Sequence, residues 1–296
     1  MNRQLWVHLT LLFVAMLYGG NYTIAKYALP EYIKPVAFIS VRLLSGTFLF
    51  WAIDSVGKRS RVSRSDHWLL FRCGLFGAAL NQLLFFEGLS LTTPIHASIM
   101  MTMSPIAVIL IASLMGRELL TRIKVIGALI GFTGAVLLLS RHGLSLEEGT
   151  FSGDLLILLN GTSYAIYLIL VKPLTHKYPP FTILKWIFLY GALIAVPFGI
   201  PQLTEVNWSG LPTSAWISIG YVVFATTFLV YLLNAWALQY VNSSVVGIYI
   251  YLQPVFATIV ALLLGQDKLD LPTVLFASII MLGVYLVSKP TRKWKN

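Results

Sequence analysis

The chain has 296 residues, of which 57% are hydrophobic and only 11% are charged, and its mean hydropathy is +0.80. Soluble proteins carry about 25% charged residues, so this sequence has too few to cover a water-facing surface. The net charge of +10 comes from Lys and Arg between apolar runs rather than from a basic face, which excludes nucleic acid as a partner. The composition indicates a polytopic protein embedded in the lipid bilayer.

Ten apolar segments follow one another along the chain, each close to the roughly 20 residues that a helix needs to cross a bilayer. Charges and turn residues divide them at 5–29, 35–53, 67–90, 94–115, 121–140, 153–172, 180–200, 212–239, 244–264 and 271–289. The first is interpreted as a retained helix rather than a signal peptide, because no small-residue cleavage site follows it. The predicted fold class is an all-α membrane protein with ten transmembrane helices.

The distribution of Lys and Arg over alternate loops predicts how these helices are oriented. With a cytoplasmic N-terminus, 15 of the 21 Lys and Arg residues fall in inside segments, including Lys58 and Arg59. Only Lys34, Arg141 and Lys268 fall outside. Because cytoplasmic loops carry the excess of positive charge, we expect both termini in the cytoplasm. As a separate expectation, the protein is placed in the plasma (inner) membrane of a bacterium.

The chain contains an internal repeat, because a shift of 149 residues superposes 97–140 on 246–289 without a gap. The copies share the pairs Pro105/Pro254, Gly116/Gly265 and Gly134/Gly283, and a shift of 146 adds Tyr18/Tyr164 and Lys26/Lys172. Five spans per copy is an odd number, so the second repeat, 146–296, is inverted in the membrane relative to the first, 1–145. Inverted repeats are typical of secondary transporters, whose binding sites lie near the bilayer midplane.

The paired prolines fall near the centres of the fourth and ninth spans. Proline removes a helix hydrogen bond and clashes one turn back, so Pro105 and Pro254 free the carbonyls of Met101 and Ile250. A freed carbonyl in a membrane must find another partner or face a cavity. A simple packing kink explains one proline, but a symmetric pair at midplane predicts a role in gating.

Polar residues recur on single faces of five predicted spans. Tyr18, Asn21 and Tyr22 in the first span follow helical spacing, as do Asn160, Ser163, Tyr164 and Tyr167 in the sixth. Unpaired amides are costly in hydrocarbon, so these faces are expected to point inward. Interhelical hydrogen bonding explains any one stripe, and five together predict a substrate cavity. The twelve residues predicted to bind substrate there are Tyr18, Asn21, Tyr22, Arg42, Asn81, Gln82, Tyr164, Tyr167, Tyr231, Asn234, Tyr251 and Gln253.

Three charged residues within the spans are candidates for transport roles. Arg42 lies near midplane, where a charge costs at least ~2.5–3.5 kcal/mol, so it either binds a substrate carboxylate or joins helices through backbone carbonyls. Glu87 is the acidic residue farthest from the span ends, which makes it the candidate for proton coupling. Lys26 either snorkels to the outer interface or takes part in coupling.

Several functions are disfavoured by what the sequence lacks. Cys73 is the only cysteine and the five histidines show no close pairing, so no metal site and no cofactor are expected. The chain has no P-loop, and the S-G-D at 152–154 lacks the first glycine of an intramembrane aspartyl protease. We expect a carrier rather than an enzyme; a channel, a receptor and an intramembrane enzyme are the alternatives from other classes.

The order of these motifs resembles the drug/metabolite transporter superfamily, and in particular its EamA-type metabolite exporters. The resemblance covers the whole chain and rests on YGGNYTIAK (18–26), SVRLLSG (40–46), GLSLTTPIHASIMMTMSP (88–105), GRELLT (116–121) and GALIGFTGAVLL (127–138). It implies export of small metabolites, often amino acids, through a central cavity between the repeats. Zwitterionic or aromatic compounds suit the tyrosine- and amide-rich faces.

Within the same superfamily, a nucleotide-sugar or sugar-phosphate exchanger is the alternative. Such substrates carry several negative charges and require clustered Lys or Arg. The second half offers only Lys172 and Lys185, both near span ends. The glycines at 127, 131, 134 and 283 predict close helix packing, and we expect a monomer or a weak homodimer.

Overall fold

The helices of the computed structural model follow the apolar segments of the sequence closely. The structure describes residues 3–56, 60–140, 151–263 and 270–289, and within these ranges it contains helices and turns but no strand. Nine helices there are long and apolar enough to cross a bilayer, and a further apolar helix, Ser243–Ile259, is shorter. The predicted all-α class with ten apolar helical segments is confirmed.

Six of the ten segments are single helices, and four are interrupted. The uninterrupted ones are α1 (Arg3–Lys26), α2 (Pro35–Val56), α7 (Arg122–Ser140), α8 (Phe151–Thr175), α9 (Pro180–Glu205) and α14 (Leu271–Ser288). The interrupted ones are α3–η1–α4 (Arg64–Gly74, Leu75–Ala79, Leu80–Leu91), α5–α6 (Pro94–Met101, Ser104–Leu114), α10–η3–α11 (Thr213–Tyr221, Val222–Leu229, Val230–Ala237) and α12–η4–α13 (Ser243–Ile248, Tyr249–Tyr251, Leu252–Leu263). A short 3-10 turn, η2 (Trp208–Gly210), precedes α10.

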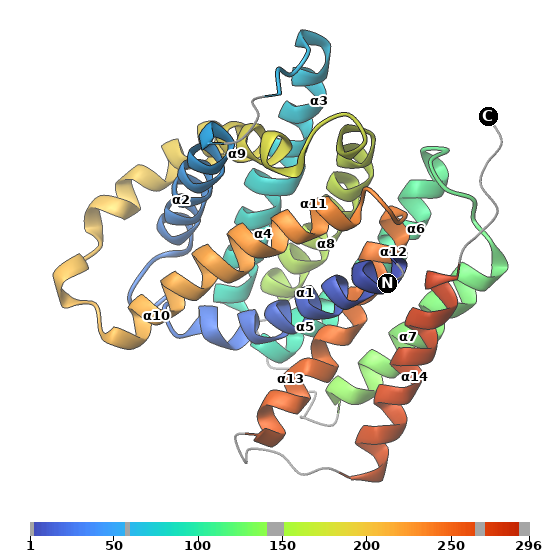
Figure 1. The fold of residues 1–296 in the computed structure, drawn as a ribbon. Coiled ribbons are helices and arrows are strands. Elements are labelled where there is room, and N and C mark those ends of the chain that lie inside the picture. The colour runs from blue at the N-terminus through green and yellow to red at the C-terminus, as the bar shows by residue number, and fades with distance from the viewer. Residues whose placement is uncertain (1–2, 57–59, 141–150, 264–269, 290–296) are drawn as a thin grey trace.

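The helices pack with a two-fold pattern that follows the repeat. Each of two pairs joins a helix to its own repeat counterpart: α2 packs along α9, and α7 packs along α14 (Figure 1). The central contacts are exchanged between the halves, because α1 packs on α13 while α8 packs on α6. Likewise α4 packs on α8 while α11 packs on α1. The interior is therefore built from both repeats.

The α7–α14 pair depends on glycine, as the sequence predicts. A Cβ atom at Gly283 would lie 2.5 Å from the backbone nitrogen of Gly131, and one at Gly127 would lie 2.8 Å from the Cβ of Leu286. Both distances are shorter than van der Waals contact, so any side chain would push the two helices apart. These glycines lie between α7 and α14 and are therefore used inside the molecule.

Both paired prolines follow a break in their helix instead of lying inside a continuous one. Pro105 stands in the first turn of α6, after a turn at Thr102 and Met103, and Pro254 stands near the start of α13, after the 3-10 turn η4. The expectation of a mid-helix proline was wrong in this detail. At the first turn the amide hydrogen that proline lacks has no helical partner in any case, so the proline fits the break and starts the second half-helix.

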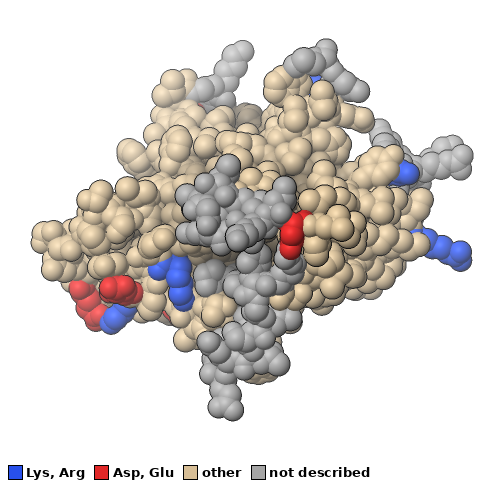
Figure 2. Space-filling view, turned by 90° about the horizontal axis from the view of Figure 1, so that it is seen from below, with Lys and Arg blue, Asp and Glu red and all other residues tan. Residues whose placement is uncertain are grey.

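Large apolar side chains cover the outside of the molecule, as a lipid-facing surface requires. Phe48 and Phe198 are 72% exposed, and Leu193 is 64% exposed. The face in Figure 2 shows few charged side chains among many neutral ones. Buried polar residues such as Asn21, Gln82 and Asn160 lie inside instead. This reversal of the usual soluble pattern agrees with a protein that spans a bilayer.

Two acidic residues in the connecting segments hold the ends of helices. Asp270 caps α14, because its carboxylate accepts from the backbone nitrogen of Thr273 at 3.1 Å. Glu118 does more than close its own turn: it accepts from Lys124 at 2.6 Å and from the backbone nitrogen of Ser244, at the start of α12, at 3.1 Å. It thus ties the loop after α6 to the second repeat.

Some predictions fall on residues outside the described ranges. These are Lys58, Arg59, Arg141, Lys268, Arg292, Lys293 and Lys295, which all entered the orientation count. The predicted boundary between the repeats, at 145 and 146, also lies there. The boundary and the cytoplasmic position of both termini stay predictions.

Candidate functional site

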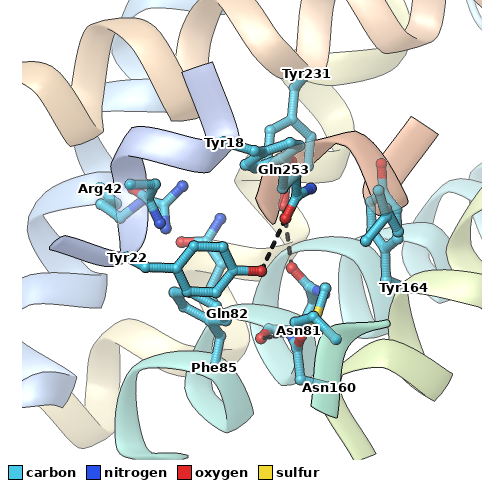
Figure 3. A pocket seen from close by; sticks show the side chains of 13 residues that line it. Tyr18, Tyr22, Arg42, Asn81, Gln82, Phe85, Asn160, Tyr164, Tyr231 and Gln253 are labelled. Carbon is cyan, nitrogen blue, oxygen red and sulfur yellow. Dashed lines mark hydrogen bonds between the residues drawn. The ribbon is translucent and has the colours of Figure 1, made fainter. Parts of the chain in front are cut away.

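A cavity lies at the centre of the molecule, where the two halves meet (Figure 3). Its volume is about 50 Å³, and since one water needs about 10–15 Å³, only a few waters fit. The side chains come from both repeats. The lining consists of Tyr18, Asn21, Tyr22, Arg42, Asn81, Gln82, Phe85, Met101, Asn160, Tyr164, Tyr231, Ile250 and Gln253.

Most of the predicted binding residues converge on this cavity. Nine of the twelve line it: Tyr18, Asn21, Tyr22, Arg42, Asn81, Gln82, Tyr164, Tyr231 and Gln253. Asn234 lines a smaller adjoining cavity that shares Tyr18 and Tyr164 with the central one. The structure does not bring Tyr167 and Tyr251 to either cavity.

Tyr167 and Tyr251 are packing residues in this structure. Their side chains are 1% and 0% exposed, and each ring covers a glycine. A Cβ at Gly77 would lie 2.2 Å from the Tyr167 ring, and one at Gly131 would lie 2.4 Å from the Tyr251 ring. Sequence spacing placed them on the polar face, but the adjacent glycines made room for their rings between helices.

Four lining residues were absent from the predicted set. Asn160 was recognised on the polar face of its span, and Met101 and Ile250 as the carbonyl positions opposite the prolines. Met101 and Ile250 line the cavity because the breaks before Pro105 and Pro254 turn the chain toward it. Phe85 carried no signal in the sequence, because an apolar residue in an apolar span looks the same whether it faces lipid or a cavity.

Hydrogen bonds across the cavity join elements from different repeats. The Tyr22 hydroxyl donates to Gln253 Oε1 at 2.8 Å, which ties α1 to α13 (Figure 3). Tyr231 on α11 donates to the carbonyl of Gly77 at 2.7 Å. Gly77 belongs to η1, and π-helical turns leave carbonyls open to other partners and often mark functional sites. The widened turn therefore supplies an acceptor at the cavity wall.

Arg42 is held against the second π-helical turn. Its Nε donates to Thr227 Oγ1 at 2.7 Å and its Nη2 to the carbonyl of Thr226 at 3.5 Å, both in η3. The guanidinium lies 4.8 Å from the centre of the Phe86 ring. Arg42 thus joins helices and lines the cavity at once, so the two interpretations drawn from the sequence do not exclude each other.

The two candidate coupling residues lie apart from the cavity lining. Lys26 does not snorkel: its Nζ donates to the carbonyls of Leu89 at 2.6 Å and Thr92 at 3.2 Å, at the end of α4. Glu87 is partly buried on α4, and among the described residues its carboxylate has no hydrogen-bond or ion-pair partner. The proline breaks border the cavity through Met101 and Ile250.

Comparison with known proteins identifies the family. The model of the EamA-like transporter family matches the chain twice, at residues 5–140 and 151–289. The chain belongs to the EamA-like transporter family. The two matches to one model agree with an internal repeat, and this EamA-like chain is a multi-pass membrane protein.

Relatives of this EamA-like transporter come from distant organisms. An uncharacterized transporter from Archaeoglobus fulgidus is 29% identical and covers 95% of this chain and 96% of its own. The uncharacterized transporter YyaM of Bacillus subtilis is 22% identical, with coverages of 97% and 94%. A WAT1-related protein of Arabidopsis thaliana is 23% identical, with coverages of 98% and 87%. A solved crystal structure shares the fold with a TM-score of 0.76 at 17% identity, over 95% of this chain and 96% of that one.

Proposed function

We propose that this EamA-like transporter is a secondary carrier that exports small metabolites, amino acids or similar zwitterionic and aromatic compounds, by alternating access through the central cavity. The observation that carries the proposal is the position of the cavity. It lies between inverted repeats, it is lined by polar groups from both, and it borders the interruptions before Pro105 and Pro254. Carriers with inverted repeats place their substrate sites at such interrupted helices.

The size of the cavity supports a mechanism in which its walls move. A volume of about 50 Å³ is too small for an amino acid, so a substrate enters only when helices separate. The Tyr22–Gln253 hydrogen bond spans from α1 to α13 and must break or rearrange when that interface opens. An exchange cycle then alternates between two arrangements of the halves, each favoured by a few kcal/mol at most.

Counterflow of amino acids into proteoliposomes containing the purified protein tests this proposal. We expect saturable uptake that is accelerated by unlabelled substrate inside. Tyr22→Phe removes the hydroxyl of a lining residue and should change the half-saturation concentration. The matched control is Tyr27→Phe, the same substitution near the end of α1 at a residue that is 63% exposed. Uptake that rises linearly with concentration, without acceleration, would reject a carrier and favour a channel.

A further inference from the structure

We propose that the central cavity selects a solute with one carboxylate and no ammonium group, an organic monoanion with a small apolar or aromatic body, and that Arg42 and Gln82 bind its carboxylate. The inference rests on the proposed carrier mechanism and its cavity, and it replaces the zwitterionic compounds of that proposal with monoanions of similar size. It concerns the charge of the solute, which the polar lining residues decide more sharply than its shape.

Arg42 is a buried cation with unused donors. A guanidinium carries five N–H donors, and the protein supplies two acceptors, Thr227 Oγ1 at 2.7 Å and the Thr226 carbonyl at 3.5 Å. The residue is 5% exposed and has no carboxylate within ion-pair distance among the described residues. A buried charge without a counter-ion is costly, and a bidentate carboxylate is the ligand that best fits the guanidinium fork.

The side chain of Gln82 provides a second, independent observation. Its side chain lines the same cavity and is 1% exposed, yet neither its amide nitrogen nor its amide oxygen makes a hydrogen bond of normal length, and the Tyr231 hydroxyl is the polar group close to it. Gln82 and Phe86 are four residues apart on α4 and therefore share a face, and Phe86 carries the Arg42 guanidinium 4.8 Å from its ring centre. The Gln82 amide and the Arg42 guanidinium line the same cavity, and we infer that both offer N–H donors to one anionic group.

The cavity has no group to neutralise an ammonium. Among the described residues that line it, none is Asp or Glu, and Arg42 carries the single formal charge. In a low-dielectric site, charge–charge interactions are several times stronger than in water. The ammonium of a zwitterion bound beside Arg42 would meet a like charge and only neutral acceptors. A monoanion has the attraction without that repulsion.

The repeat indicates that the cavity binds a solute with one carboxylate rather than two. In the second and seventh spans a shift of 151 residues relates Lys34 to Lys185 and Asp54 to Glu205, which form equivalent ion pairs. The same shift relates Arg42 to Leu193, which is 64% exposed on the outside. The second half therefore supplies no matching cation, and a solute with two negative charges would find only one partner.

Binding of charge-matched solutes tests the proposal. Two series keep the body constant and change the charge: lactate, alanine and alaninol, and phenyllactate, phenylalanine and phenylalaninol. Isothermal titration measures binding to the detergent-purified full chain, and counterflow in proteoliposomes, with protein-free vesicles as control, measures exchange. In at least one series we expect the anion to bind roughly tenfold tighter than the zwitterion, and the cation not to bind.

Variants separate carboxylate binding from a structural role. Arg42→Gln should weaken binding of the anion by roughly 30-fold or more, because truncating a buried charge pair costs at least that much, and should abolish the preference over the zwitterion. Arg42→Lys should keep the preference in reduced form. Gln82→Leu, which removes no protein hydrogen bond of normal length, covers the case in which Arg42→Gln does not fold, and it should weaken the anion more than the zwitterion. Arg72→Gln, on α3 and outside the cavity lining, is the matched control.

The outcomes distinguish this inference from the function on which it rests. Exchange of the zwitterion at least as well as the anion would overturn charge selection while leaving the carrier intact. An equal loss of all solutes in Arg42→Gln, with an unchanged ratio in Gln82→Leu, would also overturn it and leave Arg42 as a helix-joining residue. If neither series binds or exchanges at all, both the inference and the assignment of this cavity as the substrate site fail.

Discussion

The two ends of the α2–α9 pair carry equivalent ion pairs in different surroundings. Lys185 at the start of α9 binds Asp54 near the end of α2. Lys34, just before α2, binds Glu205 at the end of α9 at 2.5 Å. The side chains of the first pair are 11% and 7% exposed, and those of the second are 58% and 57% exposed. The two ion pairs occupy equivalent positions in the repeats, but one is buried and the other is exposed to solvent.

Repeat symmetry preserves the contact between these helices, whereas burial decides how much each ion pair contributes to stability. Asp54 also accepts from Thr182 at 2.7 Å, and the Lys185 ammonium lies 4.9 Å from the centre of the Trp51 ring. A buried, hydrogen-bonded pair is strongly destabilised when one partner is lost. A solvated pair contributes about 0–1 kcal/mol. Equivalent positions should therefore respond very differently to the same substitution.

The largest effect is expected at the buried end. Lys185→Met leaves the Asp54 carboxylate buried without its cation, and we expect a loss of about 3–5 kcal/mol in the free energy of unfolding. Unfolding of the purified protein in mild detergent, followed by denaturant titration, measures it. The matched control, Lys34→Met, should cost no more than about 1 kcal/mol.

A double variant sharpens this prediction. Lys185→Met combined with Asp54→Asn removes both charges, so it should recover part of the loss. Equal costs for Lys185→Met and Lys34→Met would show that burial does not distinguish the two ends, and the comparison would fail.

The next effect concerns two lysines that cap equivalent helix ends. Lys26 donates to the carbonyls of Leu89 and Thr92, and Lys172 donates to those of Leu238 and Val241. The acceptors are 149 residues apart in each case. Both lysines are partly buried. We therefore expect Lys26→Met and Lys172→Met to lower the free energy of unfolding by similar amounts, about 1.5–3 kcal/mol for a hydrogen bond to a charged group.

The same unfolding measurement checks this symmetry. Arg at either position keeps the charge and should retain part of the stability. A cost at one lysine several-fold larger than at the other would mean that these caps, like the ion pairs, differ in environment despite equivalent contacts.

The paired prolines test whether symmetry extends to motion. Pro105→Ala and Pro254→Ala allow a continuous helix to form across each break, and the helix-interior penalty of proline, up to ~3 kcal/mol, is an upper bound on the gain. Because both prolines stand in a first turn, we expect a smaller gain and about tenfold slower exchange, which corresponds to ~1.4 kcal/mol in the barrier.

Initial counterflow rates and the accessibility of single cysteines at each end of the cavity measure this effect. Inversion predicts that the two variants favour opposite faces of the membrane. Normal rates with normal accessibility in both would identify the prolines as packing residues.

The smallest effect on exchange is expected at Glu87, whose carboxylate has no counterpart in the second repeat. Glu87 has Trp236 at the position 149 residues later, so any role of its carboxylate belongs to the first half alone. If it couples transport to protons, Glu87→Gln should leave exchange at equal pH unchanged and remove the response to a pH gradient. Transport in proteoliposomes with and without a gradient checks it, and an unaltered response in the variant would leave Glu87 without a coupling role.

Much of the architecture was predictable because hydrophobicity in a bilayer is a strong and local signal. The spans predicted at 35–53 and 180–200 became Pro35–Val56 and Pro180–Glu205, which misses only the polar ends. That miss hid the buried Asp54–Lys185 pair, because cutting at 53 left Asp54 in a loop. The π-helical turns η1 and η3 also escaped prediction, since no residue type specifies them.

The site was predictable in its polar part and not in its apolar part. Asn21, Gln82 and Arg42 are costly in hydrocarbon, so their presence in spans already implied an interior that accepts them. Phe85 could face lipid or the cavity at similar cost, and only the packing of α4 decided. Tyr167 and Tyr251 show the opposite case, because the glycines opposite their rings turned polar-face residues into packing residues.

By itself the sequence determined that this is a ten-segment, repeat-built membrane protein with polar residues turned inward, because transfer of each side chain between lipid and interior depends on that side chain alone. The tertiary structure decided which polar groups find partners and which stay open. Lys26 is fully used by carbonyls, whereas Gln82 and part of Arg42 are not. That distinction depends on atoms contributed by helices far apart in the chain, and it is what gives the cavity its chemistry.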